Sequence, residues 1–399
     1  MPRILRIINR FNLGGPTYNV AYLSKYLSPE FETLLIGGEK DESEESSNHI
    51  LQNLGLEPII ISEMKREIDL VNDYKAYLKI KKIIQEFKPD IVHTHASKAG
   101  TIGRLAAKSC NVPVIVHTFH GHVFHSYFGK IKTALYKNIE RYLAKKTSCI
   151  VAISEKQKYE LSDSYRICDP SKISIVRLGF DLSKFQENVE QKRKAFREKY
   201  AVDSDELVVS IIGRLVPIKN HRLFVESIAY VKKHSAKKVR AFIIGDGEER
   251  KNIEAMIFEN GLSFCDSLLK QERADISFTS WSKEIDVVCA GSDIITLTSF
   301  NEGTPVSLIE AQAANKPIVS TQVGGIENVV TPHTALLSDI DDKEAFYVNL
   351  LTLVSNDELR NKMGTGGWEN VKERFHYTAL VNNMKELYHK LLLQKATNN

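Results

Sequence analysis

The sequence has few cysteines and no long apolar run. Its five cysteines are spread widely over 399 residues and form no Cys-x-x-Cys pair. Free thiols in a reducing cytoplasm explain this pattern, whereas a disulfide framework or a zinc site does not. No apolar stretch reaches the ~20 residues that a membrane-spanning helix needs. The first residues also lack the length and the cleavage site of a signal peptide. We therefore expect a cytoplasmic protein.

The net charge is also small. Lys and Arg number 54 against 50 Asp and Glu, a formal net charge of +4, which is too little to predict a nucleic-acid partner. Hydrophobic residues make up 43% of the chain and charged residues 26%, as in ordinary soluble globular proteins. Because 399 residues exceed what one hydrophobic core usually serves, we expect two domains.

Short β-branched runs alternate with helical patterns along the whole chain. Segments such as 18–27 and 74–87 carry apolar residues at helical spacing, as do 102–109 and 131–145. This alternation predicts an α/β fold with two doubly wound, Rossmann-like parallel sheets. The predicted strands are 4–8, 33–36, 58–61, 90–94, 114–118, 148–153 and 173–176, then 207–212, 239–244, 276–279, 294–298, 317–320 and 335–337.

Ligands of such sheets bind outside the carboxyl ends of the strands, and the segment after strand 294–298 is the strongest candidate there. Thr304 suits a helix N-cap and Pro305 the first helical position, so a helix is predicted over 306–315. Together with the helix dipole, four free N–H groups would make an anion site, those of Gly303, Thr304, Val306 and Ser307.

Two carboxylates, Glu302 and Glu310, flank this predicted anion site. Carboxylates repel a phosphate unless they face neutral groups. Sugar hydroxyls are natural partners of that kind. Taken alone, the spacing of the two glutamates also fits an ordinary surface loop.

The residues around the two glutamates resemble the retaining glycosyltransferases of family 4. Gly-Thr-Pro follows Glu302, Ala-Gln-Ala-Ala-Asn-Lys-Pro-Ile-Val-Ser-Thr follows Glu310, and Val323-Gly324-Gly325-Ile326-Glu327 closes the next strand. The resemblance implies the GT-B fold, two Rossmann-like domains facing across a cleft. It implies transfer of a sugar, with retention, from a nucleotide diphosphate sugar to an acceptor hydroxyl. We expect the donor to be a UDP-sugar, bound as a co-substrate.

The resemblance also implies roles for single residues. Glu310 would hold the ribose hydroxyls, the Glu302–Thr304 turn the donor sugar, and Trp281 would lie near the base. No residue stands out as a covalent nucleophile. A front-face attack guided by the donor phosphate is the usual proposal for such enzymes.

Two cations, Arg214 and Lys219, follow strand 207–212. An Arg as a planar fork and a Lys as a point charge suit one diphosphate. Alone, either would more often be a solvated surface cation. The resemblance implies that they stabilise the charge that grows on the leaving diphosphate. Since these cations would stand in for a metal ion, we expect no metal and no cofactor.

Two motifs in the first half complete the predicted site. Gly14 and Gly15 follow the first strand, where they would let the backbone approach the donor, although a plain tight turn explains glycines equally well. Histidines cluster at 93–95 and 117–125 without a carboxylate or a helical spacing, so they do not predict a metal site. The resemblance implies that His120 reaches the donor sugar. Ser97-Lys98-Ala99-Gly100 and Gly103-Arg104 resemble members that build surface polysaccharides.

The domain boundary is predicted near Asp181. The two series of predicted strands are separated by residues 177–185 and then by a polar, charge-rich tract that runs to Asp205. The first domain would comprise residues 1–181 and the second residues 182–376. In the family a C-terminal helix packs back on the first domain, and residues 377–396 would do so here. Residues 262–275 depart from the family pattern.

The predicted helix over 130–146 is strongly basic on one side. Glu140 is its only acid, and its apolar side carries Ile131, Leu135, Ile139, Tyr142 and Leu143. An adjacent stripe consists of Lys130, Lys137, Arg141 and Lys145. The stripe fits a solvated face, and it also fits peripheral contact with anionic lipid at the inner face of the membrane. The acceptor would be a glycan or a lipid-linked glycan, and a lipid-linked one would need such contact.

Two other functions are compatible with these motifs. Nucleotide-sugar 2-epimerases share the architecture, and epimerisation needs no acceptor. A non-catalytic sugar-nucleotide sensor would also bind phosphate. The presence of all four residues that would act on the leaving group or the sugar argues against a mere sensor; these are Arg214, Lys219, Glu302 and Glu310.

Overall fold

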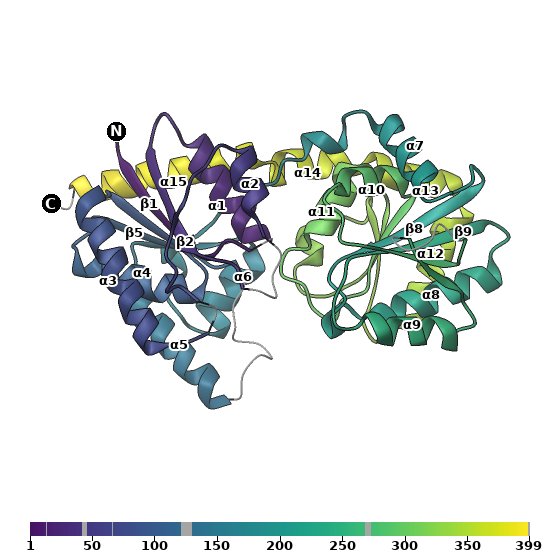
Figure 1. Ribbon diagram of the computed structural model, residues 1–399, viewed down its shortest axis with the longest axis horizontal. Coiled ribbons are helices and arrows are strands. Elements are labelled where there is room, and N and C mark those ends of the chain that lie inside the picture. The colour runs from purple at the N-terminus through teal and green to yellow at the C-terminus, as the bar shows by residue number, and fades with distance from the viewer. Residues whose placement is uncertain (13, 42–45, 66, 121–129, 268–272, 398–399) are drawn as a thin grey trace. The chain divides into compact units, whose positions relative to one another are not determined.

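The computed structural model describes residues 1–12, 14–41, 46–65, 67–120, 130–267 and 273–397, and for residues 130–132 the backbone alone. The chain divides into two compact units (Figure 1). The first unit comprises residues 1–180 and 375–399, and the second comprises residues 181–374. Each unit is built on its own parallel sheet.

The first unit has, in its described residues, seven parallel strands in the order β3-β2-β1-β4-β5-β6-β7. Strands β4 and β5 are buried along their whole length, which explains their nearly continuous apolar runs. The predicted strands are confirmed with small shifts at their ends. The bounds are β1 Arg3–Arg10, β2 Glu32–Gly38, β3 Ile59–Ile60, β4 Ile91–His95, β5 Val114–Thr118, β6 Cys149–Ala152 and β7 Ile173–Ile175.

The second unit also has seven parallel strands in its described part, in the order β10-β11-β9-β8-β12-β13-β14. Six of them were predicted. The bounds are β8 Glu206–Ile212, β9 Lys238–Ile244, β10 Phe264–Asp266, β11 Ile276–Ser280, β12 Ile294–Leu297, β13 Ile318–Thr321 and β14 Ala335–Ser338. The α/β class with two Rossmann-like sheets is therefore confirmed.

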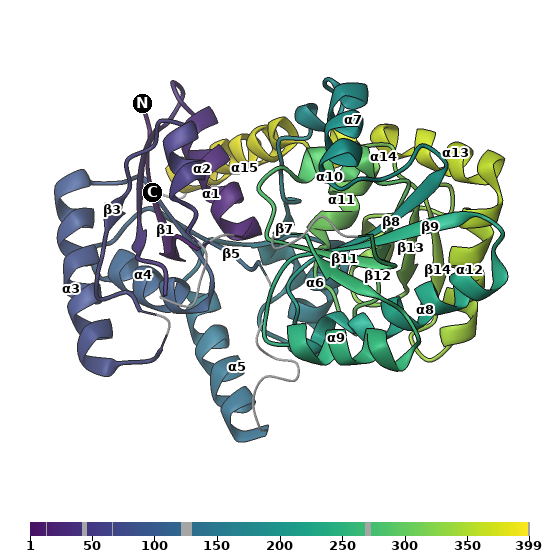
Figure 2. The ribbon, with the colours of Figure 1, turned by 45° about the vertical axis from the view of Figure 1, so that its right-hand side comes forward.

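Helices cover both faces of each sheet (Figure 2). In the first unit they are α1 Gly15–Tyr26, α2 Asn48–Asn53, α3 Leu70–Phe87, α4 Ser97–Ser109, α5 Lys130–Lys145, α6 Glu155–Tyr159 and α15 Tyr377–Thr397. The others are α7 Val189–Lys199, α8 His221–His234, α9 Arg250–Glu259, α10 Ile285–Gly291, α11 Val306–Ala313, α12 Lys343–Ser355, α13 Asp357–Thr365 and α14 Gly367–Phe375.

The C-terminal helix α15 belongs to the core of the first unit. Leu380, Met384 and Tyr388 lie in one apolar cluster with Ile4 of β1 and Val116 of β5. Their spacing of four residues puts them on one side of the helix. Helix α15 thus shares one face of the sheet with α1, and α3 and α4 cover the other.

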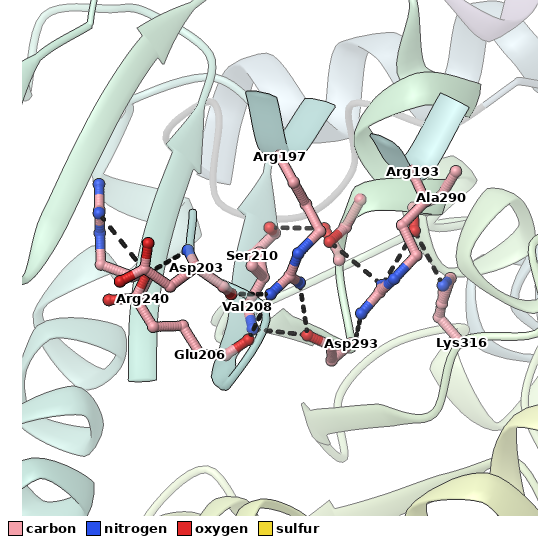
Figure 3. Close-up of polar contacts among 12 residues, drawn as sticks. Arg193, Arg197, Asp203, Glu206, Val208, Ser210, Arg240, Ala290, Asp293 and Lys316 are labelled. Carbon is pink, nitrogen blue, oxygen red and sulfur yellow. Dashed lines mark hydrogen bonds and ion pairs between the residues drawn. The ribbon is translucent and has the colours of Figure 1, made fainter. Parts of the chain in front are cut away.

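The polar, charge-rich tract after the predicted domain boundary contains helix α7, Val189–Lys199. Its single buried apolar side chain, Phe196, packs edge-on against Phe242. Its charges are used in a network at the amino ends of β8 and β12 (Figure 3). Arg193 Nη2 donates to Asp293 Oδ1 at 2.7 Å, and the amide of Val208 donates to Asp293 Oδ2 at 2.7 Å. These charges of the tract therefore bind tertiary partners instead of water.

The segment 262–275 contributes an edge strand. Phe264–Asp266 forms β10, which pairs in parallel with β11, and Ser263 Oγ donates to Asp275 Oδ2 at 2.7 Å. The strand was missed because three residues are too few for a periodic pattern. Residues 268–272 of this segment lie outside the described residues.

Each sheet reverses its strand order at one point. The reversal lies between β1 and β4 in the first unit and between β8 and β12 in the second. Loops at the carboxyl ends of such strand pairs diverge and leave room for a ligand. The loops that follow β1, β8 and β12 carry most of the predicted site residues.

Candidate active site

The loop between β12 and α11 presents a helix N-terminus, as predicted, but with a different cap. Pro305 is the N-cap, with φ −73° and ψ 99°, and helix α11 begins at Val306. The Pro305 carbonyl accepts the amides of Leu308 and Ile309 at 3.2 and 3.3 Å. The prediction of Thr304 as the cap was wrong. Pro305 has an extended backbone, so it lies outside the helix and is itself the residue next to the first helical turn.

This helix end offers unpaired donors. Within the described residues, no hydrogen bond is formed by the amides of Gly303, Thr304, Val306 and Ser307. The first amides of a helix have no partner inside it, and the helix dipole adds partial positive charge there. The geometry is that of an anion site at the carboxyl end of β12.

A glycine pair holds this loop from behind. Gly324 has φ +59°, and a Cβ there would lie 1.9 Å from the carbonyl oxygen of Glu302. The amide of Gly325 donates to the same oxygen at 2.9 Å. Only glycine tolerates both the conformation and the contact. The Gly-Gly of the family motif therefore fixes the backbone at Glu302.

The structure brings Lys219 and Glu302 together. Lys219 lies at the end of a short 3-10 helix, Pro217–Lys219, and its Nζ is 2.5 Å from Glu302 Oε1. Ser299 Oγ donates to the same oxygen at 2.6 Å. With both donors on Oε1, the second carboxylate oxygen has no bond to a described residue. We had expected Glu302 to face sugar hydroxyls, whereas in the structure it faces the cation of Lys219.

Arg214 is exposed and unpaired, in contrast to Lys219. It directly follows β8 and Gly213, and its guanidinium has no hydrogen bond or ion pair in the described part of the chain. Fixing an exposed arginine side chain in one geometry costs side-chain entropy, so without a partner it is not held in place. Arg214 is thus available to a ligand.

Three glycines of the predicted site have room beside them. A Cβ at Gly14 or Gly15 would find its nearest neighbour at 3.7 Å, and one at Gly303 would find none within 4 Å. None of the three has a backbone conformation that requires glycine. The fold itself does not demand these glycines, which favours close approach of a ligand over the plain tight turn.

Glu310 lies in the second turn of α11, apart from the Lys219–Glu302 pair. Burial raises its pKa from the ordinary 4.5 to about 7, Lys184 opposes the shift and Asp286 reinforces it. The side chain has no hydrogen bond to a described residue. A carboxylate kept unpaired at this cost is typical of a functional site.

The raised pKa predicts a pH-dependent effect of Glu310→Gln on stability. The folded state holds the proton more tightly than the unfolded chain, so the stability that the group contributes is present below pH 4.5 and is lost as the pH rises through about 7. Glutamine removes that loss, and the variant should gain on the order of 1–2 kcal/mol at pH 8.5 but less at pH 5.5. Urea unfolding at both pH values, with Glu187→Gln as the control for one lost charge, checks this. A gain that is equal at both would contradict it.

Trp281 and His120 lie on different units. Trp281 follows β11 and is 48% exposed, which leaves its indole face open to a flat ring. His120 follows β5, and its Nε2 is 2.9 Å from Nδ1 of His95. Burial lowers the pKa of His120 to about 4, so its imidazole is neutral. The remaining residues of that motif, 121–125, lie outside the described residues.

The Ser-Lys-Ala-Gly motif after β4 has a packing function. A Cβ on Gly100 would lie 2.4 Å from the ring of His117, and one on Gly103 would lie 2.7 Å from Thr94. Arg104 is fully buried and pairs with Glu140 at 2.7 Å. These residues hold α4 against the sheet and α5 against α4.

Clustered acidic or histidine side chains suitable for a metal ion are absent from the described residues. Two Asp-x-Asp pairs do occur in the sequence, at 203–205 and 339–341. Asp203 is bound by Arg273, and Asp205 pairs with Lys238 at 2.8 Å. Both precede β8, at the end of the strand opposite to Arg214.

Comparisons with known proteins decide the family. Models for "Glycosyl transferases group 1" and "Glycosyltransferase Family 4" match residues 192–369 and 13–184. The UDP-Gal:alpha-D-GlcNAc-diphosphoundecaprenol alpha-1,3-galactosyltransferase of Escherichia coli is 30% identical over 336 residues, 83% of this chain and 83% of that protein. The chain belongs to glycosyltransferase family 4. The predicted family and enzyme class are confirmed.

Two further comparisons are consistent with this family. The capsular polysaccharide biosynthesis glycosyltransferase CapM of Staphylococcus aureus is 25% identical, covering 82% of this chain and 84% of that protein. The crystal structure of Anabaena Alr3699/HepE in complex with UDP has a TM-score of 0.79 at 16% identity, covering 97% of this chain and 100% of that one. This likeness confirms the GT-B type of fold. In the described residues of the glycosyltransferase, no helix has the length and apolar character to cross a membrane.

Proposed function

We propose that this glycosyltransferase moves a sugar, with retention, from a UDP-sugar to a hydroxyl of a glycan or lipid-linked glycan during synthesis of cell-surface polysaccharide. The observation that carries the proposal is the anion site at α11, with Lys219 at one side and glycines that leave room for a ligand. The activity in the name of the Escherichia coli relative supports a UDP-sugar donor and a diphosphate-linked acceptor. The name of CapM supports polysaccharide synthesis.

Each of the predicted site residues would bind one part of the donor. The amides from Gly303 to Ser307 and the cations Arg214 and Lys219 would neutralise the diphosphate. Trp281 would stack on the base, and Gly14, Gly15 and His120 of the first unit would contact the diphosphate and the sugar. Glu310 would bind ribose hydroxyls, so Glu310→Gln should raise the donor KM more than it lowers kcat.

A donor panel tests the proposed function. Purified protein is incubated with UDP-glucose, UDP-galactose, UDP-N-acetylglucosamine or GDP-mannose, with and without a prenyl-diphosphate-linked N-acetylglucosamine, and release of nucleoside diphosphate is measured. We expect release with one UDP-sugar, increased by the acceptor, and a product that keeps the anomeric configuration of the donor. Conversion of a donor to its 2-epimer without acceptor, or inversion in the product, would contradict the proposal.

Metal independence is part of the proposal. If two protein cations and a helix N-terminus neutralise the leaving diphosphate, saturating EDTA should leave most of the activity intact. The measurement is the initial rate of UDP release before and after chelation, with dialysis against metal-free buffer as a second arm. Complete loss that Mg²⁺ or Mn²⁺ restores would show that the charge is neutralised in another way.

The membrane proposal concerns helix α5, whose N-terminal half projects from its unit in both views (Figures 1 and 2). Part of the predicted apolar side does not face the core: Leu143 is 1% exposed, but Leu135 is 59% and Tyr142 54% exposed. Two cations of the basic stripe are engaged within the fold. Lys137 lies over the ring of Tyr165, and Arg141 donates to the carbonyls of residues 165 and 166. The side chain of Lys130 lies outside the described residues.

Exposed apolar side chains beside cations are typical of an interfacial helix. We therefore expect the protein to sediment with vesicles of anionic lipid and to be released by salt, because such attraction is screened within about 8 Å at physiological ionic strength. The triple variant Leu135→Ser, Tyr142→Ser and Lys145→Gln leaves the engaged cations intact and should bind much less. The matched control on the second unit is Phe258→Ser, Val348→Ser and Lys251→Gln. Equal binding of both variants would refute membrane contact through α5.

A further inference from the structure

Histidines gather at the carboxyl ends of β4 and β5. His93, His95 and His117 are fully buried, and His120 follows β5. The ring centroids of His93 and His95 are 4.1 Å apart, and those of His95 and His120 are 5.2 Å apart. We call these four residues the histidine cluster. A buried ring that gains a second proton carries a charge away from water, so its neighbours decide whether it can do so.

His93 lies beside a permanent cation. Arg6 of β1 is fully buried, and its Nη1 is 3.1 Å from His93 Nδ1. The hydroxyl of Tyr388 is 2.5 Å from the same nitrogen, and His93 Nε2 is 2.7 Å from Thr118 Oγ1. Whichever nitrogen holds the proton of the neutral ring, a second proton would place two positive charges in contact. Burial, with Arg6 as a further cause, lowers the pKa of His93 well below its usual range.

His95 and His120 resist a further proton as a pair. His95 Nδ1 is 2.9 Å from His120 Nε2, and the two outer nitrogens are buried without a partner in the described part of the chain. The neutral pair holds one bridging proton and one outer proton, whichever ring donates the bridging bond. A third proton would make both outer nitrogens buried N–H groups without an acceptor, which is unfavourable. Burial lowers the pKa of His95 well below its usual range and that of His120 to about 4.

His117 has a second buried cation nearby. It lies opposite Thr94 in the β4–β5 pairing, and its Nδ1 is 2.8 Å from Thr94 Oγ1. Its Nε2 is buried and has no partner among the described residues. Burial lowers the pKa of His117 well below its usual range, and Arg104 adds to the effect. A proton on this ring would therefore also meet a cation.

No carboxylate compensates for this positive charge. In the described residues, the hydrogen bonds of the four rings go to Arg6, to hydroxyl groups and to each other, with no acid among the partners. The charged groups beside the cluster are the cations Arg6 and Arg104, and Glu140, whose carboxylate is paired with Arg104 at 2.7 Å. Tyr388 stays neutral, because burial raises the pKa of its hydroxyl. The folded unit therefore keeps the whole cluster without extra protons.

We propose that the histidine cluster makes the first unit labile in mild acid, so that this unit opens near pH 5 while the second unit stays folded. The unfolded chain binds a proton at each histidine near pH 6.5, and the folded unit does not. The stability that depends on the neutral rings is thus present above pH 6.5 and is lost as the pH falls toward 4. At pH 5 each fully buried ring raises the ratio of open to closed molecules about 30-fold. This inference does not rest on the proposed function.

The second unit responds differently to acid. Its single buried histidine in the described residues is His221, whose pKa burial, aided by Lys219, lowers to about 4. Against this, Glu310 has a pKa raised to about 7 by burial, so the folded state gains stability as the pH falls. The two effects oppose each other at pH 5. The second unit therefore loses much less stability than the first between pH 7.5 and 5.

Two buried cysteines report on the two units separately. Cys149 of β6 is 4% exposed and Cys289 of α10 is fully buried, so each reacts only when its own unit opens. The protein is labelled at pH 7.5 and 5.0, in subdenaturing urea, with 2,2′-dithiodipyridine, which also reacts with thiols in acid. Mass spectrometry of peptides gives each rate, which is divided by the rate of the unfolded protein at the same pH. From pH 7.5 to 5.0 we expect a rise of roughly 10³-fold or more at Cys149, equivalent to two rings, and less than about tenfold at Cys289.

A substitution in the cluster tests its cause. His117→Asn removes one titrating ring, and its amide can donate to Thr94 or accept from it. The rise at Cys149 should shrink about 30-fold, and a general loss of stability would not change this, because the readout is a ratio between two pH values. The matched control is His389→Asn in α15, whose partly exposed imidazole pairs with Glu30 at 2.6 Å; it should not shrink the rise.

Three outcomes would overturn the proposal. The first is a rise at Cys149 no larger than that at Cys289, which would show that acid does not act on the first unit selectively. The second is an unchanged rise in His117→Asn, and the third is an equal reduction in His117→Asn and His389→Asn. All of these measurements are made without substrate, so they stand whichever donor the panel identifies.

Discussion

Replacing Arg214 or Lys219 by alanine should lower turnover by roughly 10²-fold or more while the protein stays folded. Charge develops on the diphosphate as the glycosidic bond breaks, and a preset cation stabilises that charge by on the order of 3 kcal/mol. Arg214 is exposed and unpaired in the described residues, and surface cations add little to folding stability. The measurement is kcat for UDP release, with circular dichroism melting to confirm folding.

The two variants should differ in one respect. Lys219 pairs with Glu302 at 2.5 Å, so its loss also releases one constraint on that carboxylate, whereas Arg214→Ala removes only a ligand contact. The matched control is Arg222→Ala, an arginine of α8 whose ion pairs with Glu226 and Glu259 are both 3.9 Å long. Near-normal kcat in both Arg214→Ala and Lys219→Ala would refute the leaving-group role.

The second large effect is expected at Glu302. Glutamine keeps the size of the side chain but removes the charge that binds Lys219 at 2.5 Å and accepts from Ser299 at 2.6 Å. Because the resemblance places this turn at the donor sugar, Glu302→Gln should lower kcat by roughly 10-fold to 10²-fold with a smaller change in donor KM. Steady-state kinetics with the donor that the panel identifies would measure both parameters.

An acidic residue nearby provides the control. Glu327 lies beside the Gly324-Gly325 pair, and its carboxylate binds only Gln322 in the described residues. Glu327→Gln should leave kcat within about twofold, as most surface substitutions do. If Glu302→Gln instead raised KM and left kcat unchanged, Glu302 and Glu310 would have exchanged roles.

The charged segments show which features a local sequence pattern predicts and which it does not. The sequence predicted every strand of the first sheet because buried parallel strands are runs of β-branched residues, which are visible without tertiary information. The charges of α7 were visible only as a polar tract, because the sequence does not show that Arg193 meets Asp293, 100 residues away. In the same way, Leu135 and Tyr142 looked like core positions, although more than half of each residue is exposed. Periodicity gives the side of a helix, and only the packed structure shows what that side faces.

The same difference between local pattern and tertiary contact holds for the candidate site. The sequence by itself determined the helix N-terminus after β12, the two glutamates, the two cations and the family, because these features are contiguous or lie at predicted strand ends. Tertiary structure alone decided that Lys219 meets Glu302, since they follow strands β8 and β12, which are neighbours in the sheet but 82 or more residues apart in the chain. It also decided that His95 meets His120, 25 residues away. Hydrogen bonds and ion pairs act over about 3 Å, and strand order, which no local pattern encodes, determines which side chains come that close.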